Sequence, residues 1–233
     1  MNRFDQTFVT SLAAALVCTL LSLTSTASAA PLTFSGITFD DGALAFADEV
    51  VSYVQGANVG FPNDDPLEAL GTPDLPSGPG VDFVSLGNFQ TSNPLAATLV
   101  LRFTDNSLTT SGDATKDLHI FEIGAVVERM DIFIAKTLAT PWIFVGRLEG
   151  KPTSVDIDAV TGVLLGELFS YVKIVDGSEG GSGFPFGGAD IDAVGAISSG
   201  AAVPTIPLPA ALPLLLTGLI SLGLVGWHRR KAA

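Results

Sequence analysis

Ala97-Thr-Leu-Val-Leu-Arg-Phe-Thr104 is the clearest alternating segment of the chain. Leu99, Leu101 and Phe103 fall on one face of an extended backbone, whereas Arg102 falls on the other. A period of two residues is the pattern of a β-strand that buries one of its faces. This segment therefore predicts a strand that packs one side against a hydrophobic core.

Eight other short segments alternate in the same way or form continuous apolar runs, with clusters of Gly, Pro, Asn and Asp between them. Such segments predict strands joined by turns. No long stretch repeats apolar residues every 3.6 positions, so units of alternating strand and helix are not expected. We predict an all-β fold, an antiparallel β-sandwich of the jelly-roll kind. The eight further strands are expected at Ala47–Gln55, Asp82–Leu86, Asp117–Ile123, Met130–Ala135, Ile143–Leu148, Ser154–Ile157, Phe169–Val175 and Asp190–Ile197.

The N-terminal segment, residues 1–29, has the composition of a secretory signal peptide. A basic start is followed by an apolar run over residues 8–23, and Ala27-Ser28-Ala29 is a small-x-small cleavage site. We predict removal by signal peptidase after Ala29, because a cut one residue later would place Pro31 beside the scissile bond. An uncleaved membrane anchor is the alternative.

The C-terminal segment, residues 203–233, combines a Pro-rich stretch, an apolar run and a basic cluster. The apolar run over residues 208–227 has about 20 residues, which at about 1.5 Å per residue span a hydrocarbon core of about 30 Å. We predict a transmembrane helix whose basic end stays in the cytoplasm; the alternative is a buried core helix. The Pro-rich stretch contains Val203, Pro204, Pro207, Leu208 and Pro209, and the basic cluster is Arg229, Arg230 and Lys231.

This three-part tail resembles the PEP-CTERM sorting signal of exported proteins of Gram-negative bacteria. The resemblance implies recognition by an exosortase, a membrane enzyme that removes such tails near the Pro motif. Where the family name expects Pro-Glu-Pro, this chain has Pro207-Leu208-Pro209, which leaves the cleavage point open. Because the resemblance covers the tail alone, it predicts a destination: an inner-membrane precursor with a periplasmic domain, then the cell surface or the extracellular matrix.

The segment between the two ends, residues 30–202, is expected to form one acidic domain. The chain has a net charge of −13, and 23 of its 24 acids but only seven of its 11 bases lie in this segment. Such a charge repels phosphate backbones and excludes nucleic-acid binding. The single cysteine, Cys18, lies in the leader, so the domain has no disulfide and no cysteine-based nucleophile or metal site.

Several motifs of the middle segment are similar to a β-sandwich domain found on PEP-CTERM proteins, akin to galactose-binding-like jelly rolls. They are Ala47-Asp-Glu-Val-Val-Ser-Tyr53, Ala69-Leu-Gly-Thr-Pro-Asp74, Val84-Ser-Leu-Gly87, Asp117-Leu-His-Ile-Phe-Glu122 and Gly188-Ala-Asp-Ile-Asp-Ala-Val194. The resemblance implies that the first and last strands are adjacent and that a structural calcium ion lies nearby. We therefore expect Asp48, Asp74, Asp190 and Asp192 to converge on Ca²⁺, which prefers six to eight oxygen ligands. The alternative is a hydrated acidic strand end.

Two side chains, Trp142 and His119, are of the types that take part in ligand binding or catalysis. Trp142 follows Pro141 and is a candidate platform for stacking a sugar, although core packing explains most aromatic residues here. His119 is expected to be a packed residue, because no serine elbow accompanies it. We therefore expect a non-catalytic structural, adhesive or carbohydrate-binding module whose ligand is an extracellular polysaccharide. The alternatives are a secreted hydrolase that uses paired carboxylates and a permanently membrane-anchored surface protein.

Overall fold

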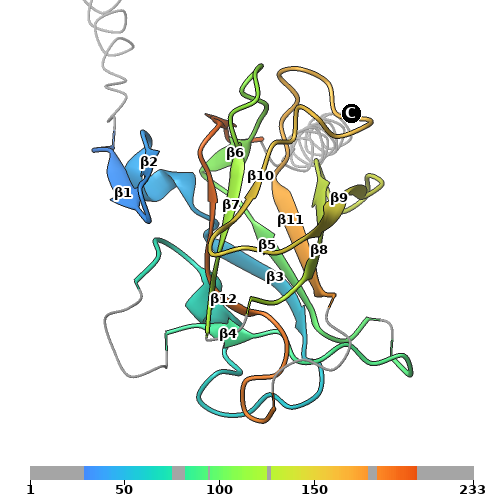
Figure 1. The fold of residues 1–233 in the computed structure, drawn as a ribbon. Coiled ribbons are helices and arrows are strands. Elements are labelled where there is room, and N and C mark those ends of the chain that lie inside the picture. Colours follow the sequence, from blue (N-terminus) through green and yellow to red (C-terminus); the bar gives the residue numbers. More distant parts are fainter. Residues whose placement is uncertain (1–28, 75–81, 94, 125–126, 178–182, 204–233) are drawn as a thin grey trace, which may run out of the picture.

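The computed structural model describes residues 29–74, 82–93, 95–124, 127–177 and 183–203. Within them the chain forms thirteen strands and two short 3₁₀-helices (Figure 1). The elements are β1 (Leu32–Phe34), β2 (Ile37–Phe39), η1 (Gly42–Ala45), β3 (Glu49–Val54), η2 (Pro66–Ala69), β4 (Val84–Ser85), β5 (Thr98–Arg102), β6 (Asn106–Leu108), β7 (Leu118–Ile123), β8 (Met130–Ala135), β9 (Ile143–Leu148), β10 (Thr153–Val155), β11 (Tyr171–Asp176), β12 (Asp190–Ala196) and β13 (Ser199–Ala201).

Two antiparallel sheets make up the body of the molecule. One has the order β10-β7-β12-β4 and the other the order β3-β5-β11-β8-β9. Two small two-stranded sheets, β1-β2 and β13-β6, complete the fold. All strand pairs between the described elements are antiparallel, so the predicted all-β, antiparallel class is confirmed. Strands occur in all nine segments predicted from the sequence.

A single hydrophobic cluster draws on both large sheets, as expected for a β-sandwich. It includes Val84, Ile120 and Ile191 from the smaller sheet and Leu101, Ile132 and Ile174 from the larger one. Each such side chain, fully removed from water, contributes about 1.5–3 kcal/mol of transfer free energy. This core holds the edges of the two sheets in fixed positions.

A second cluster of aromatic rings lies on the other side of the smaller sheet. Phe39 and Phe46 pack against each other with ring centroids 4.6 Å apart, and both contact Phe121 of β7. The β1–β2 hairpin supplies this layer (Figure 1). Gly195 of β12 lies directly beneath it, because a Cβ atom there would approach Phe39 to 2.7 Å and Phe46 to 2.8 Å.

The chain termini carry most of the predicted export signals. Residues 1–28, with Ala27, lie outside the described residues, as do residues 204–233 with the predicted helix 208–227 and the basic cluster Arg229–Lys231. Of the Pro-rich stretch, Val203 alone is described. Within the described part of the chain, no helix has the length and hydropathy that a membrane span requires.

Candidate functional site

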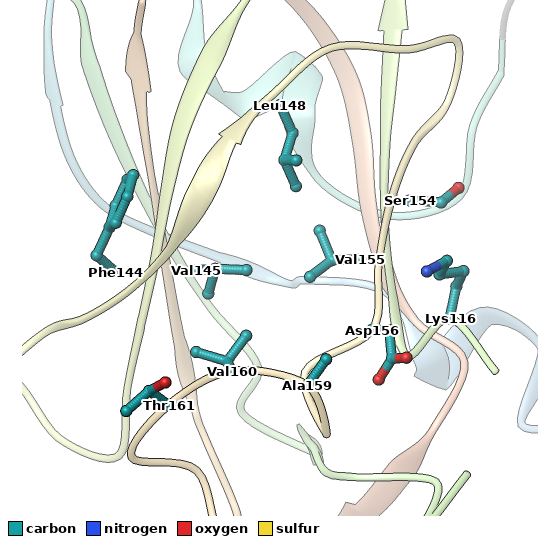
Figure 2. A pocket seen from close by; sticks show the side chains of 10 residues that line it. All are labelled: Lys116, Phe144, Val145, Leu148, Ser154, Val155, Asp156, Ala159, Val160 and Thr161. Carbon is teal, nitrogen blue, oxygen red and sulfur yellow. The ribbon is translucent and has the colours of Figure 1, made fainter. Parts of the chain in front are cut away.

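A groove runs between β9 and β10, the edge strands of the two sheets. Its volume is about 460 Å³. Figure 2 shows how side chains of the two edges and of the following turn converge on it. The lining residues are Lys116, Phe144, Val145, Leu148, Ser154, Val155, Asp156, Ala159, Val160 and Thr161.

The wall of the groove on the β9 side is shaped by a bulge. Ile132 of β8 lies opposite Gly146, but the next residue, Phe133, lies opposite Phe144, so Val145 is an extra residue in β9. A bulge bends a strand and redirects its side chains. Val145 points into the groove, while Phe144 marks one end with about half of its surface exposed, at 52%.

The opposite end of the groove is polar and carries Lys116 and Asp156 (Figure 2). The groove is therefore amphipathic, with apolar valines and a phenylalanine along its length and two charged groups at one end. Such a combination binds ligands that have both apolar faces and hydroxyl or charged groups.

Asp156 also belongs to a cluster of three carboxylates. Oxygen atoms of Asp117, Asp156 and Asp158 all lie within 4.8 Å of one another. The topology explains the cluster, because Leu118 at the start of β7 pairs with Val155 at the end of β10. Asp117 precedes β7 and the other two follow β10, so an antiparallel ladder brings them together.

Two of these carboxylates are held in place by the backbone. Asp117 is fully buried, and its two oxygens accept hydrogen bonds from the amides of Ser111 and Ile157, each at 2.8 Å. Asp158 accepts bonds from the Ser111 hydroxyl and the Gly112 amide, each at 3.0 Å. The side chains are thus oriented before any ligand binds.

Asp156 is different, because its Oδ1 atom is buried and has no hydrogen-bond partner among the described residues. A buried oxygen without a donor costs free energy unless a cation, a water molecule or a ligand group satisfies it. Three convergent carboxylates are ligands that suit Ca²⁺. The cluster has the donor chemistry of a calcium site at the polar end of the groove.

The four aspartates expected from the sequence to bind calcium do not form such a cluster. Asp48 accepts hydrogen bonds from the amide and hydroxyl of Thr104. Asp190 accepts a bond of 2.5 Å from the Ser85 hydroxyl. Asp192 accepts a bond from the Asp74 amide at 3.5 Å, which brings these two residues together.

A bulge in β12 explains why Asp190 and Asp192 differ from expectation. The register shifts between Ile191 and Ala193, which leaves Asp192 as an extra residue. Ile191 and Val194 both belong to the core, so the simple alternation that would place the two aspartates on one face is broken. Neither the sequence pattern nor its spacing marks this bulge.

Trp142 lies at the start of β9 and is half-buried. The ammonium group of Lys173 lies 4.7 Å from its ring centroid and 4.2 Å from that of Phe133. Phe133 in turn packs on Phe144, with centroids 5.1 Å apart. The predicted stacking residue is thus part of an aromatic and cationic row that ends at the groove.

His119 is buried, and its Nδ1 atom lies 2.9 Å from the hydroxyl oxygen of Ser154. Burial lowers the pKa of His119, so the ring stays neutral at physiological pH. Although Ser154 borders the groove, its hydroxyl points away from the apolar centre (Figure 2). The pair is therefore a packed contact of β7 and β10.

Two buried acids have strongly raised pKa values, and one of them, Glu122, was not expected from the sequence to be a site residue. Burial raises the pKa of Glu122 to about 8, and burial likewise raises the pKa of Asp190 to about 7. Glycoside hydrolases use a pair of carboxyl groups in which the general acid has a raised pKa and the second group is ionised. These two acids do not line the groove, whose single carboxylate is Asp156. Neither of the two acids with a raised pKa therefore faces the groove.

Comparisons with protein-family models, with curated proteins and with solved structures found no match to this chain.

Proposed function

We propose that the chain is an exported, non-catalytic β-sandwich module that binds a glycan in the groove between β9 and β10, with Ca²⁺ bound by Asp117, Asp156 and Asp158. Its terminal segments act as a signal peptide and as an exosortase-type sorting signal. The jelly-roll topology and the kinship with galactose-binding-like domains belong to this proposal.

The observation that carries the proposal is the double role of Asp156. The same side chain lines the groove and belongs to the carboxylate cluster, and one of its oxygens is buried without a partner. A calcium ion at this point would satisfy the oxygen and offer open coordination positions to hydroxyl groups of a sugar. The valines and Phe144 would cover the apolar face of the sugar ring.

Titration calorimetry of the full chain with CaCl₂ tests the metal site. We expect binding that Asp156→Asn weakens by about tenfold or more, because a carboxylate ligand becomes a neutral amide. Asp40→Asn, which changes an exposed acid outside the cluster, is the matched control. Equal calcium affinity of the wild-type chain and the Asp156→Asn variant would refute the site.

A glycan array probed with the calcium-loaded chain, and again after addition of EDTA, tests the ligand. We expect binding that EDTA abolishes and that Phe144→Ala weakens, since loss of one ring contact costs about 1–3 kcal/mol in an apolar site. Leu138→Ala removes an apolar side chain that is similarly exposed but lies outside the groove. Glycan binding that persists in EDTA would show that the sugar binds without the metal.

The sorting proposal is tested independently of the ligand. Mass spectrometry of the mature protein should find a C-terminus near Pro204 to Pro209, and a reporter fused after Ala202 should be active outside the cytoplasm. An intact C-terminus would favour a permanently anchored surface protein instead. Reporter activity in the cytosol would rule out export.

A further inference from the structure

Glu122 is the most unusual acid of the described chain. Its side chain is completely buried, yet neither carboxylate oxygen has a hydrogen-bond partner among the described residues. The Nζ atom of Lys151 lies 3.7 Å from Oε2 of Glu122. The lysine also donates a short hydrogen bond to the carbonyl oxygen of Gly124.

The ladder between β7 and β10 places the two residues opposite each other. Thr153 pairs with Ile120, so continuing the antiparallel register by two residues brings Lys151 next to Glu122. On its other side Glu122 lies opposite Ile191, a core residue. Residues directly opposite each other share a face of the sheet, so the carboxyl group lies at the inner, water-excluded side.

An ordinary buried ion pair explains this arrangement poorly. Two charges removed from water are stable only with good geometry and with further hydrogen bonds to the remaining polar atoms. Here the separation is long and both carboxylate oxygens lack a donor. Burial also raises the pKa of Glu122 to about 8, which keeps the carboxyl group neutral near pH 7.

We propose that Lys151 and Glu122 condense to form an intramolecular amide between Nζ of the lysine and Cδ of the glutamate. The product satisfies the groups that the pair leaves unsatisfied. One orphan oxygen departs as water, and the new amide N–H keeps the bond that Nζ already donates to the Gly124 carbonyl.

The chemistry needs no co-reactant. The lysine ammonium gives a proton to a nearby carboxylate, and the amine attacks Cδ of the protonated carboxyl group. The C–OH bond then breaks as the same neighbour returns its proton to the departing hydroxyl. This neighbour, again a carboxylate, then accepts the second proton that leaves the nitrogen, so the ammonium and the carboxyl lose one water and one proton overall. Glu128 and Asp190, both buried and close enough to act electrostatically on Glu122, are the candidates for this proton transfer.

A second lysine–glutamate pair shows why burial matters. Lys136 Nζ lies only 2.6 Å from Glu167, but the lysine side chain is 44% exposed and the glutamate 19%. Hydrogen bonds to Lys136 and to the Leu164 amide lower the pKa of Glu167, so its carboxylate is ionised and unreactive towards an amine. The Lys136–Glu167 pair has proximity alone, whereas the Lys151–Glu122 pair also has a neutral and water-excluded acid.

The bond would connect β7 with the segment before β10 and enclose β8 and β9, which belong to the other sheet. The sole cysteine, Cys18, lies in the leader, so a disulfide cannot provide this link. This inference is independent of the proposed glycan and calcium sites.

Tryptic digestion of the full chain followed by mass spectrometry tests the bond. Cleavage yields the peptides 117–129 and 148–173, because Pro152 protects the bond after Lys151. We expect one branched species that is lighter than the sum of the two peptides by one water molecule. Recovery of both peptides unlinked at full mass from the wild-type chain would overturn the proposal.

Variants make the assignment specific. Lys151→Arg keeps the positive charge but cannot condense, so its two peptides should separate. Glu122→Gln should give the same branched product as the wild type, because the amide loses ammonia in place of water. Lys136→Arg is the matched control and should leave the branched peptide unchanged; a branched peptide that persists in Lys151→Arg would contradict the assignment.

Discussion

Asp190 is a single residue whose protonation should be visible in the stability of the whole domain. Burial raises its pKa to about 7 from an ordinary value of 3.8, and the charge of Glu128 adds to the effect while the Ser85 hydroxyl and Lys151 oppose it. Between these two values the folded state binds more protons at this site than the unfolded state. The free energy of unfolding therefore falls as the pH rises through this window.

We predict that Asp190→Asn removes this decrease in the free energy of unfolding with rising pH. The amide stays neutral and keeps an oxygen that can accept the hydrogen bond from Ser85. Between pH 4 and pH 8 the free energy of unfolding of the variant should rise by roughly 2–4 kcal/mol relative to that of the wild type. Urea unfolding at both pH values measures the difference. Asp40→Asn, at an exposed acid, should show no such gain, and parallel pH profiles of wild type and Asp190→Asn would contradict the prediction.

Single residues also show which part of the carboxylate cluster the sequence alone does not predict. The pair Asp156-Ile-Asp158 is visible in the sequence as two acids at strand spacing, a pattern that equally suits a polar strand face beside a turn. Its importance comes from Asp117, which lies 39 positions earlier and reaches it only through the pairing of β7 with β10. Spacing along the chain carries no information about that pairing. The resemblance to jelly-roll domains instead predicts a calcium site at Asp48, Asp74, Asp190 and Asp192.

At the scale of the elements, β12 depends on a glycine for its contact with the aromatic layer. A methyl group at Gly195 would overlap the rings of Phe39 and Phe46. We predict that Gly195→Ala destabilises the domain by about 1–3 kcal/mol, because tightly packed rings cannot move without strain. Denaturant unfolding measures the change.

Gly183→Ala provides the matched control, because a Cβ atom there meets no other atom within 4 Å. Its free energy of unfolding should stay within about 0.5 kcal/mol of the wild-type value. An equally small effect of Gly195→Ala would mean that the β1–β2 hairpin does not pack firmly on the sheet.

The strands themselves were largely predictable, for a physical reason. Strands such as β5 and β8 alternate buried and half-exposed residues or carry continuous apolar runs, and these patterns are local. β1, β2, β6 and β13, each of three residues, were not expected from the sequence. The order of strands within the sheets depends on long-range packing, so β7 between β10 and β12 could not be inferred from the pattern of any one segment.

For the molecule as a whole, bound calcium should act as a stabiliser. A ligand that binds only the folded state adds RT ln(1 + [L]/Kd), or about 2.7 kcal/mol at a hundredfold excess over Kd. We predict that CaCl₂ raises the melting temperature of the full chain by about 5 °C or more, since Asp117 and Asp158 anchor two segments far apart in sequence. Scanning calorimetry with and without EDTA measures the shift, and Asp156→Asn should reduce it to about half or less at the same calcium concentration. An undiminished shift in this variant would place the ion elsewhere.

Under the proposed attachment of the protein by its tail, the small ladder between β13 and β6 has a mechanical role. Three residue pairs, from Ser199 opposite Leu108 to Ala201 opposite Asn106, connect the end of the described chain to the body of the molecule. Tension applied beyond Val203 therefore reaches these few hydrogen bonds before it reaches the sandwich. Under force the hydrogen bonds of this ladder would break first, and the released residues would extend while the core remains folded.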